Sequence, residues 1–249
     1  MDAGPTAENA REVVRVVLPT YNEAENLERI VAAVLEAAPD LDGLLVVDDD
    51  SPDGTGAIAD RLAAADHRVD VMHRRRKEGL GPAYVAGFSQ VLAEGADLIV
   101  QLDADFSHDP RDVPRLIEAV RSGADLVLGS RYVPGGAVGD WGWARRAISR
   151  GGSAYARVLL GLPIRDLTGG FKCYRREVLS AIRLDSVGAL GYAFQVETTY
   201  RAVLAGFRVV EVPILFSDRR VGESKMSRAI VGEAALRVPL MRLRGRRWS

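Results

Sequence analysis

Short apolar runs divide the first half of the chain into regularly spaced segments. Each run has four to six residues, is rich in Val, Leu and Ile, and is followed by a polar loop. Runs of this length and composition predict strands that are buried in a sheet. The predicted strands lie at 13–18, 44–47, 69–72, 97–102 and 125–129.

Between these strands, apolar residues recur every three or four positions. Leu27, Ile30, Val31, Val34 and Leu35 form one such series, which places them on a single helix face. Segments with similar apolar spacing lie between the later predicted strands. Strands that alternate with helices predict an α/β fold with a mostly parallel, Rossmann-like sheet and helices on both faces.

The second half has a different pattern. A Gly-rich loop at 133–143 precedes a predicted helix at 144–160, and a turn-rich connection follows at 166–172. Another helix is predicted at 194–205. The run at 209–214 contains Pro213, which cannot donate a hydrogen bond within a sheet, so it is predicted to be an edge strand.

A chain of 249 residues is long enough for one large domain with a core of its own. We predict a flexible tail at 1–12 and a single domain at 13–226, with a nucleotide half at about 13–130 and an acceptor half at about 131–226. From Arg219 onward, the sequence contains nine Lys and Arg residues but only two Glu residues. Apolar residues are interleaved with them, so 227–249 is predicted to be a basic amphipathic tail that either lies on an anionic membrane or frays in solvent.

The composition is that of an ordinary globular protein. It is 47% hydrophobic and 27% charged with a formal net charge of -1, which disfavours a general nucleic-acid binder. Cys173 is the only cysteine, which excludes an intrachain disulfide or a cysteine-cluster metal site. The N-terminus does not resemble a signal peptide, and no apolar run reaches the roughly 18 residues of a membrane span. We therefore expect a cytoplasmic protein, and the scarcity of Lys among the basic residues suggests a bacterial source.

Two aspartates follow the fourth predicted strand. Asp103 and Asp105 lie at its C-terminal end, where open α/β sheets bind their ligands. Two carboxylates this close repel each other unless a cation or hydrogen bonds compensate them, and Mg²⁺ or Mn²⁺ with a diphosphate would do so. The alternative from the pair alone is a solvated turn that caps the next helix.

Other polar loops are predicted at the same edge of the sheet. A loop with Tyr and Glu follows the first strand, an acidic loop follows the second, and Arg131 follows the fifth. Such an edge suits a nucleotide, whose base, ribose and diphosphate would meet these groups. Neither common Gly-rich phosphate loop is present, which disfavours a dinucleotide dehydrogenase or a P-loop hydrolase.

These motifs resemble the family 2 glycosyltransferases with a GT-A fold, and more narrowly the dolichyl- or polyprenyl-phosphate mannose synthases. The resemblance implies transfer of mannose from GDP-mannose to a polyprenyl monophosphate, with inversion at the anomeric carbon and with Mg²⁺ or Mn²⁺. It covers about residues 14–226. The motifs are PTYNE at 19–23, DDDSPDGT at 48–55, DAD at 103–105, GSRY at 129–132, DLTGGF at 166–171 and DRRVGESKM at 218–226.

The same resemblance implies site residues. It gives a catalytic role to Asp105, Arg131 and Lys225. Some relatives have Gln where this chain has Ser107, a weaker metal ligand, and Asp50 replaces a small Gly or Asn. The implied nucleotide-sugar site is Pro19, Tyr21, Glu23, Val47, Asp49, Asp103, Ala104, Asp105, Arg219 and Lys225, the metal ligands are Asp103, Asp105 and Ser107, and the acceptor-phosphate site is Arg131, Arg145 and Ser149.

A polyprenyl phosphate is largely ionised near neutral pH, because the second pKa of a phosphomonoester is about 6. It needs no Ser-His-Asp set to activate it. Two alternatives stay open: the same fold with a UDP-sugar donor, as in a polyprenyl-phosphate glucosyltransferase, or a non-catalytic nucleotide-sugar binding subunit. Because the lipid does not dissolve in water, we expect peripheral attachment at the inner face of the cell membrane, through the tail, a membrane partner subunit, or both.

Overall fold

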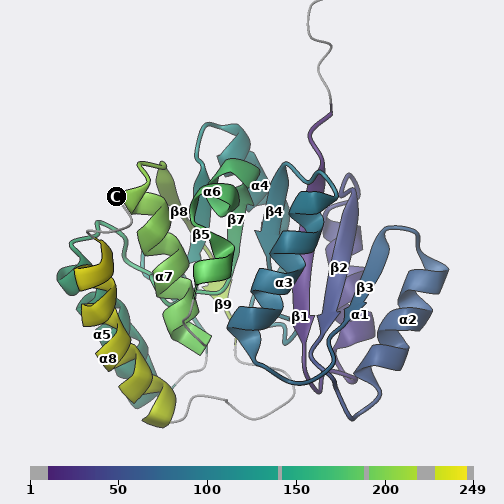
Figure 1. Ribbon diagram of the computed structural model, residues 1–249, viewed down its shortest axis with the longest axis horizontal. Coiled ribbons are helices and arrows are strands. Elements are labelled where there is room, and N and C mark those ends of the chain that lie inside the picture. Colours follow the sequence, from purple (N-terminus) through teal and green to yellow (C-terminus); the bar gives the residue numbers. More distant parts are fainter. Residues whose placement is uncertain (1–10, 140–141, 188–190, 218–227, 246–249) are drawn as a thin grey trace, which may run out of the picture.

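A seven-stranded sheet forms the centre of the molecule (Figure 1). The computed structural model describes residues 11–139, 142–187, 191–217 and 228–245. The strands lie in the order β3-β2-β1-β4-β7-β5-β8, and a separate pair joins β6 to β9. Their bounds are β1 Val14–Thr20, β2 Gly43–Asp48, β3 Val69–His73, β4 Leu98–Gln101, β5 Leu126–Ser130, β6 Ala137–Val138, β7 Lys172–Arg175, β8 Val209–Pro213 and β9 Leu215–Phe216.

Helices cover both faces of this sheet, as the sequence predicts. One face packs against α1, α2 and α4, and the other packs against α3, α6 and α7. Two short 3-10 turns, η1 at Pro110–Asp112 and η2 at Leu184–Ser186, complete the elements. The helices are α1 Leu27–Ala37, α2 Thr55–Ala65, α3 Leu80–Ala93, α4 Val113–Arg121, α5 Trp143–Leu160, α6 Arg176–Ala181, α7 Gly191–Leu204 and α8 Arg228–Gly245.

The alternation of side chains along each strand produces these two cores. In β1, Val16 and Leu18 pack on the α1 side, whereas Val17 packs on the α3 side. Both neighbours of β1 run parallel to it, so its backbone is hydrogen-bonded on both sides. The five strands predicted in the first half are therefore confirmed, and their C-terminal ends lie at one edge.

The sequence did not predict β7. This strand lies between β4 and β5 and runs antiparallel to both. It begins at Lys172, inside the segment that we expected to be a turn-rich connection, and its polar ends hide the strand pattern. The edge strand predicted at 209–214 is confirmed as β8, which pairs with β5 and ends at Pro213.

Two long helices extend the acceptor side. Helix α5 matches the prediction, and β6 occupies part of the preceding segment that was expected to be only a loop. Within the predicted tail, residues 228–245 form α8, which packs against α5 and α7. Val238 and Met241 are buried there, so this helix belongs to the folded domain. In the described part of the chain, no helix combines the length and apolar character needed to span a membrane.

Candidate active site

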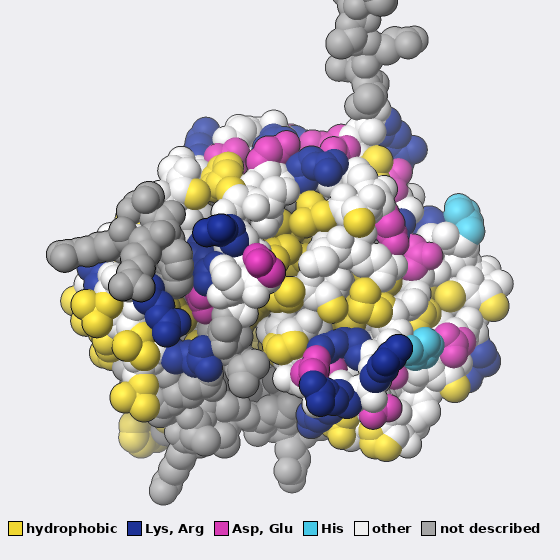
Figure 2. All heavy atoms as spheres, viewed as in Figure 1, with side chains coloured by type: hydrophobic (Ala, Val, Ile, Leu, Met, Phe, Trp, Pro, Cys, Tyr) yellow, Lys and Arg dark blue, Asp and Glu magenta, His cyan; other side chains and the backbone are white. Residues whose placement is uncertain are grey.

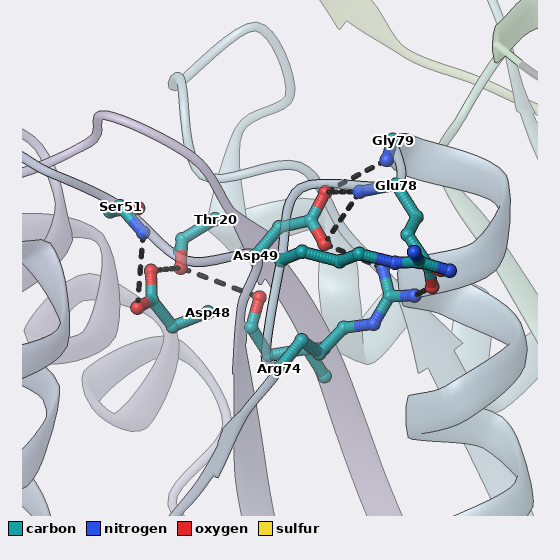
Figure 3. A network of polar contacts seen from close by, with 9 residues as sticks. Thr20, Asp48, Asp49, Ser51, Arg74, Glu78 and Gly79 are labelled. Carbon is teal, nitrogen blue, oxygen red and sulfur yellow. Dashed lines mark hydrogen bonds and ion pairs between the residues drawn. The ribbon is translucent and has the colours of Figure 1, made fainter.

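Asp49 lies immediately beyond the C-terminal end of β2 and is buried. Its carboxylate accepts the N–H of Glu78 at 3.1 Å and of Gly79 at 2.8 Å, and it pairs with Arg74 Nη1 at 2.6 Å. Figure 3 shows all three groups converging on the two oxygens. Asp49 thus holds the loop between β3 and α3 against the end of β2.

A second set of polar contacts fixes the loop after β1. Asp48 accepts weakly from the Thr20 hydroxyl and from the N–H of Ser51, each at 3.4 Å, as Figure 3 shows on the other side of β2. Asp53 accepts from Thr55 and from the N–H of Ala24. Burial would raise the pKa of Asp53, but these hydrogen bonds outweigh it and lower that pKa. The loops after β1 and β2 are therefore joined before any ligand arrives.

Several residues of the implied nucleotide site border these loops. Pro19 and Val47 are buried partners in the β1–β2 register. Lys77 places its ammonium 3.6 Å from the centroid of the Tyr21 ring. Glu23 accepts a hydrogen bond from Asn26, and Asp50 has a left-handed φ of 61°. That backbone conformation explains why Gly or Asn suits the position of Asp50 and why Asp tolerates it.

The aspartate pair lies directly beyond β4, at the same edge. Asp103 Oδ1 accepts from the hydroxyl of Tyr84 at 2.7 Å, and Asp105 Oδ1 accepts from the N–H of Ser107 at 3.0 Å. Ala104, Asp105 and Ser107 are buried. Burial and the neighbouring Asp103 carboxylate raise the pKa of Tyr84 well above its ordinary value, so this hydroxyl stays protonated and donates.

These residues fit a divalent cation whose coordination is completed by a substrate. Among the described residues, no cluster of three or more His, Cys, Asp or Glu side chains could hold a metal ion. Mg²⁺ is commonly held by one or two carboxylates while phosphate oxygens and water fill its other positions. Asp103 and Asp105 supply two such carboxylates.

His108 connects the aspartate pair to the acceptor side. Its ring is buried between Phe171 and Phe216, with centroid distances of 5.2 and 5.0 Å. The pKa of His108 is lowered to about 4, chiefly by burial; Asp105 opposes this shift, and Arg131 adds to it. His108 is therefore neutral at neutral pH, and its ring packs between those of Phe171 and Phe216.

Arg131 and Asp166 form a buried pair beyond the end of β5. Arg131 Nε and Nη2 donate to the two oxygens of Asp166 at 2.7 and 2.6 Å, and Nη2 also donates to the Thr168 hydroxyl. Burial would raise the pKa of Asp166, but Arg131 outweighs it and lowers that pKa. The Arg131 guanidinium also lies over the rings of Tyr132 and Phe216, at 5.2 and 5.1 Å. The two hydrogen bonds to Asp166 fix the plane of the Arg131 guanidinium.

The remaining residues of the implied acceptor site are only partly described. The hydroxyl of Tyr132 donates to Ser149 Oγ at 2.7 Å, which places Ser149 against Tyr132, the residue after Arg131. Arg145 lies in α5, but its side chain is outside the described residues, as are Arg219 and Lys225. The described geometry thus brings together the groups after β1, β2, β4 and β5.

Residues 15–183 match the family model described as glycosyl transferase family 2. That match spans well over half of the chain. The chain belongs to glycosyltransferase family 2. The family predicted from the motifs is confirmed.

Curated relatives of this glycosyltransferase are closely similar along most of its length. It is 53% identical over 232 residues to the polyprenol monophosphomannose synthase of Mycolicibacterium smegmatis, covering 93% of this chain and 87% of that protein. It is 52% identical over 225 residues to the undecaprenyl-phosphate mannosyltransferase of Micrococcus luteus, covering 90% and 92%. The dolichol-phosphate mannosyltransferase of Pyrococcus furiosus is 38% identical over 216 residues, which are 86% of this chain and 59% of that protein.

Solved structures of other proteins share the fold of this glycosyltransferase. Glucosyl-3-phosphoglycerate synthase from Mycobacterium tuberculosis superposes with a TM-score of 0.65 at 22% identity, covering 92% of this chain and 80% of that one. Another structure of that synthase, at TM-score 0.64 and 21% identity over the same shares, is a complex with Mn²⁺, UDP-glucose and phosphoglyceric acid. At this identity the likeness supports the GT-A-like fold alone.

Sequence reasoning missed several groups around the site of this glycosyltransferase. Asp166 and Gly170 belong to the motif at 166–171, but nothing in the spacing shows that Asp166 pairs with Arg131. Tyr84 comes from the middle of α3, where an aromatic residue predicts core packing. Its contact with Asp103 depends on how α3 lies across the sheet, which a single sequence does not specify.

Proposed function

We propose that this family 2 glycosyltransferase transfers mannose from GDP-mannose to a polyprenyl monophosphate, giving a polyprenyl phosphate mannose. The observation that carries the proposal is the identity of 53% over 93% of the chain to a polyprenol monophosphomannose synthase. A second relative with 52% identity is named for mannosyl transfer to undecaprenyl phosphate. Both matches span the aspartate pair and Arg131, and both cover most of the relative's length.

The donor is placed along the ends of β1, β2 and β4. In the proposal, the nucleotide lies against Pro19, Tyr21, Glu23, Val47 and Asp49, and Asp49 keeps the adjoining loop in place. Asp103, Ala104 and Asp105 border the sugar diphosphate. Arg219 and Lys225 complete the donor site in the proposal on sequence grounds alone.

Asp103 and Asp105, with Ser107 as a weaker third group, would hold Mg²⁺ or Mn²⁺. Such an ion neutralises charge that develops on the leaving diphosphate. The buried Asp105 is oriented by the N–H of Ser107, and Asp103 by the hydroxyl of Tyr84. The carboxylates are thus pre-oriented beyond the end of β4, where the proposal places the diphosphate.

The acceptor phosphate is proposed to lie near Arg131, Arg145 and Ser149. An ionised phosphate oxygen is itself the nucleophile, so the site has to position it behind the anomeric carbon and does not have to deprotonate it. His108 is buried between Phe171 and Phe216, and the proposed reaction does not use it as a base. Attack from that side breaks the bond to the diphosphate and inverts the configuration.

A lipid acceptor requires contact with a membrane, and one surface suits it. Helices α5 and α8 lie side by side, and Figure 2 shows their exposed apolar side chains at the left margin with basic residues beside them. The described exposed arginines of α5 are Arg146, Arg150 and Arg157, and its sequence contains no acidic residue. The exposed apolar residues of this α5/α8 surface are Trp143, Ile148, Tyr155, Val158, Leu236, Leu240 and Leu243.

A radiolabel transfer assay tests the proposed reaction. Purified protein, Mg²⁺ or Mn²⁺ and a short polyprenyl phosphate are combined with GDP-mannose, GDP-glucose, UDP-glucose or UDP-GlcNAc. We expect labelled lipid from GDP-mannose only, lost with chelator and in Asp105→Ala. Asp40→Ala, which removes an exposed carboxylate before β2, is the matched control and should retain activity.

Each other result has a clear meaning. Label from a UDP-sugar would overturn the donor and favour a polyprenyl-phosphate glucosyltransferase. Tight GDP binding without transfer from any donor would favour a non-catalytic binding subunit or a requirement for a membrane partner.

Membrane contact is tested by flotation with liposomes that contain anionic lipid. Substitution is preferable to deletion because Val238 and Met241 of α8 are buried. We expect the double variant Val158→Ser/Leu243→Ser to bind less, with Leu80→Ser, an exposed Leu of the nucleotide half, as control. Equal binding by all three proteins would contradict the use of the α5/α8 surface.

A further inference from the structure

Gln195 is a buried polar residue of α7 whose amide nitrogen is unsatisfied. Its side chain is 2% exposed, and within the described residues Nε2 has no hydrogen-bond partner. Buried amide groups are nearly always hydrogen-bonded in folded proteins. A donor left unpaired at the edge of a binding site therefore indicates a group that arrives with a ligand.

The other polar atoms of Gln195 are held by a buried network. Its Oε1 accepts from Gln101 Nε2 at 2.8 Å, and Gln101 Oε1 accepts from the hydroxyl of Tyr174 at 3.1 Å. The backbone oxygen of Gln195 accepts from the ammonium of Lys172 at 2.7 Å. These bonds leave Nε2 as the atom that faces away from the network.

Nε2 and the Asp103 carboxylate both lie close to the backbone of Gly170. A Cβ atom on Gly170 would lie 3.0 Å from Asp103 Oδ2 and 3.5 Å from Gln195 Nε2. Because Gly170 has no side chain, the space between the carboxylate and the amide donor is bordered there by backbone alone. The reverse amide orientation would turn Gln195 Oε1 toward the Asp103 carboxylate and repel it.

A hydroxyl group matches this space. It can accept a hydrogen bond from the amide and donate one toward the carboxylate at the same time. Glu197, two residues further along α7, differs because it pairs with Arg201 and so has its carboxylate held within the fold. Of Gln195 and Glu197, it is therefore the Gln195 amide nitrogen that can bind a ligand.

We propose that Gln195 Nε2 donates a hydrogen bond to a hydroxyl of the donor sugar in the space above Gly170, and so determines which sugar is accepted. This inference rests on the proposed function for the placement of the sugar next to Asp103. It adds a specificity-determining residue from α7 to the proposed donor site.

Calorimetric binding of nucleotide sugars in the presence of Mg²⁺ tests the proposal without the acceptor lipid. The probes are GDP, GDP-mannose and GDP-mannose analogues that each lack one hydroxyl. We expect Gln195→Leu to bind GDP-mannose roughly tenfold more weakly and GDP equally well. One deoxy analogue should bind the wild type and the variant with the same affinity, because it lacks the hydroxyl that Gln195 contacts.

Gly170→Ala fills the proposed space and should likewise weaken GDP-mannose binding but leave GDP binding unchanged. Gln90→Leu, which removes an amide on α3 that bonds Glu94, should bind every probe as the wild type does. A loss in Gln195→Leu that extends equally to GDP and to all deoxy analogues, or no loss, would overturn the proposal. If the proposed function is wrong, the wild-type protein will instead bind UDP-sugars and not GDP-mannose. The same comparison of nucleotide, nucleotide sugar and deoxy analogues is then made with UDP-sugars.

Discussion

Two arginine–carboxylate pairs with a buried carboxylate, one in each half of the site, are built differently. In the nucleotide half, Asp49 receives two backbone N–H groups as well as Arg74, which it shares with Glu78. In the acceptor half, Arg131 and Asp166 bind each other through two parallel hydrogen bonds, and their side chains are 4% and 0% exposed. The first carboxylate organises a loop, whereas the second compensates a fully buried cation.

This difference matters for stability. A carboxylate that accepts mainly from backbone groups can lose one partner and keep others. A buried guanidinium that loses its carboxylate remains as an uncompensated charge in a region of low polarity. We therefore expect the acceptor half to be more sensitive to the loss of a single negative charge.

Asp166→Asn gives the largest expected effect. It leaves Arg131 buried without its counter-charge, and we expect the free energy of unfolding to fall by about 3–5 kcal/mol. Urea denaturation measures this change. Asp66→Asn, which weakens a half-buried pair with Arg68, is the control and should change stability far less.

Asp49→Asn should have an intermediate effect. The amide would place an N–H group against the N–H groups of Glu78 and Gly79, and we expect a loss of about 1–3 kcal/mol together with weaker GDP binding. Denaturation and calorimetry measure the two quantities. A loss as large as that of Asp166→Asn would remove the distinction between the two pairs.

Lys172 sharpens the comparison, because it is a buried cation whose hydrogen-bond acceptors are all neutral. They are the backbone oxygen of Gln195 and the hydroxyls of Thr198 and Thr199. Burial lowers the pKa of Lys172 to about 7. Between about pH 7 and its ordinary pKa, the unfolded chain binds a proton that the folded chain has lost, so this residue's contribution to stability rises with pH.

Lys172→Met removes that titration. We expect the free energy of unfolding of the variant, relative to the wild type, to be highest at and below about pH 7 and to decrease toward pH 10. Urea denaturation at several pH values measures the difference. A relative stability that is constant with pH would show that Lys172 keeps its ordinary pKa when buried.

The same contrast explains what the sequence could predict. The nucleotide half is built from neighbouring strands and helices, so apolar periodicity predicted β1 to β5 and the acids at their ends. In the acceptor half, β7 pairs with strands that precede it by many residues, and β6 pairs with β9. Such pairings leave little local pattern. The motif residue Arg131 was identified, but its pairing with Asp166 and the approach of Gln195 and Asp103 to Gly170 depend on tertiary contacts.

The position of β7 also constrains the order in which the sheet can form during synthesis. Strand β7 separates β4 from β5, so these two strands are not hydrogen-bonded to each other and do not join the halves of the sheet directly. The 70 residues from 102 to 171 must leave the ribosome before β7 follows and links them. Until then, β4 and β5 each expose an unpaired edge, which is a site for aggregation. The nascent chain is therefore most vulnerable between the completion of β5 and the emergence of Arg175.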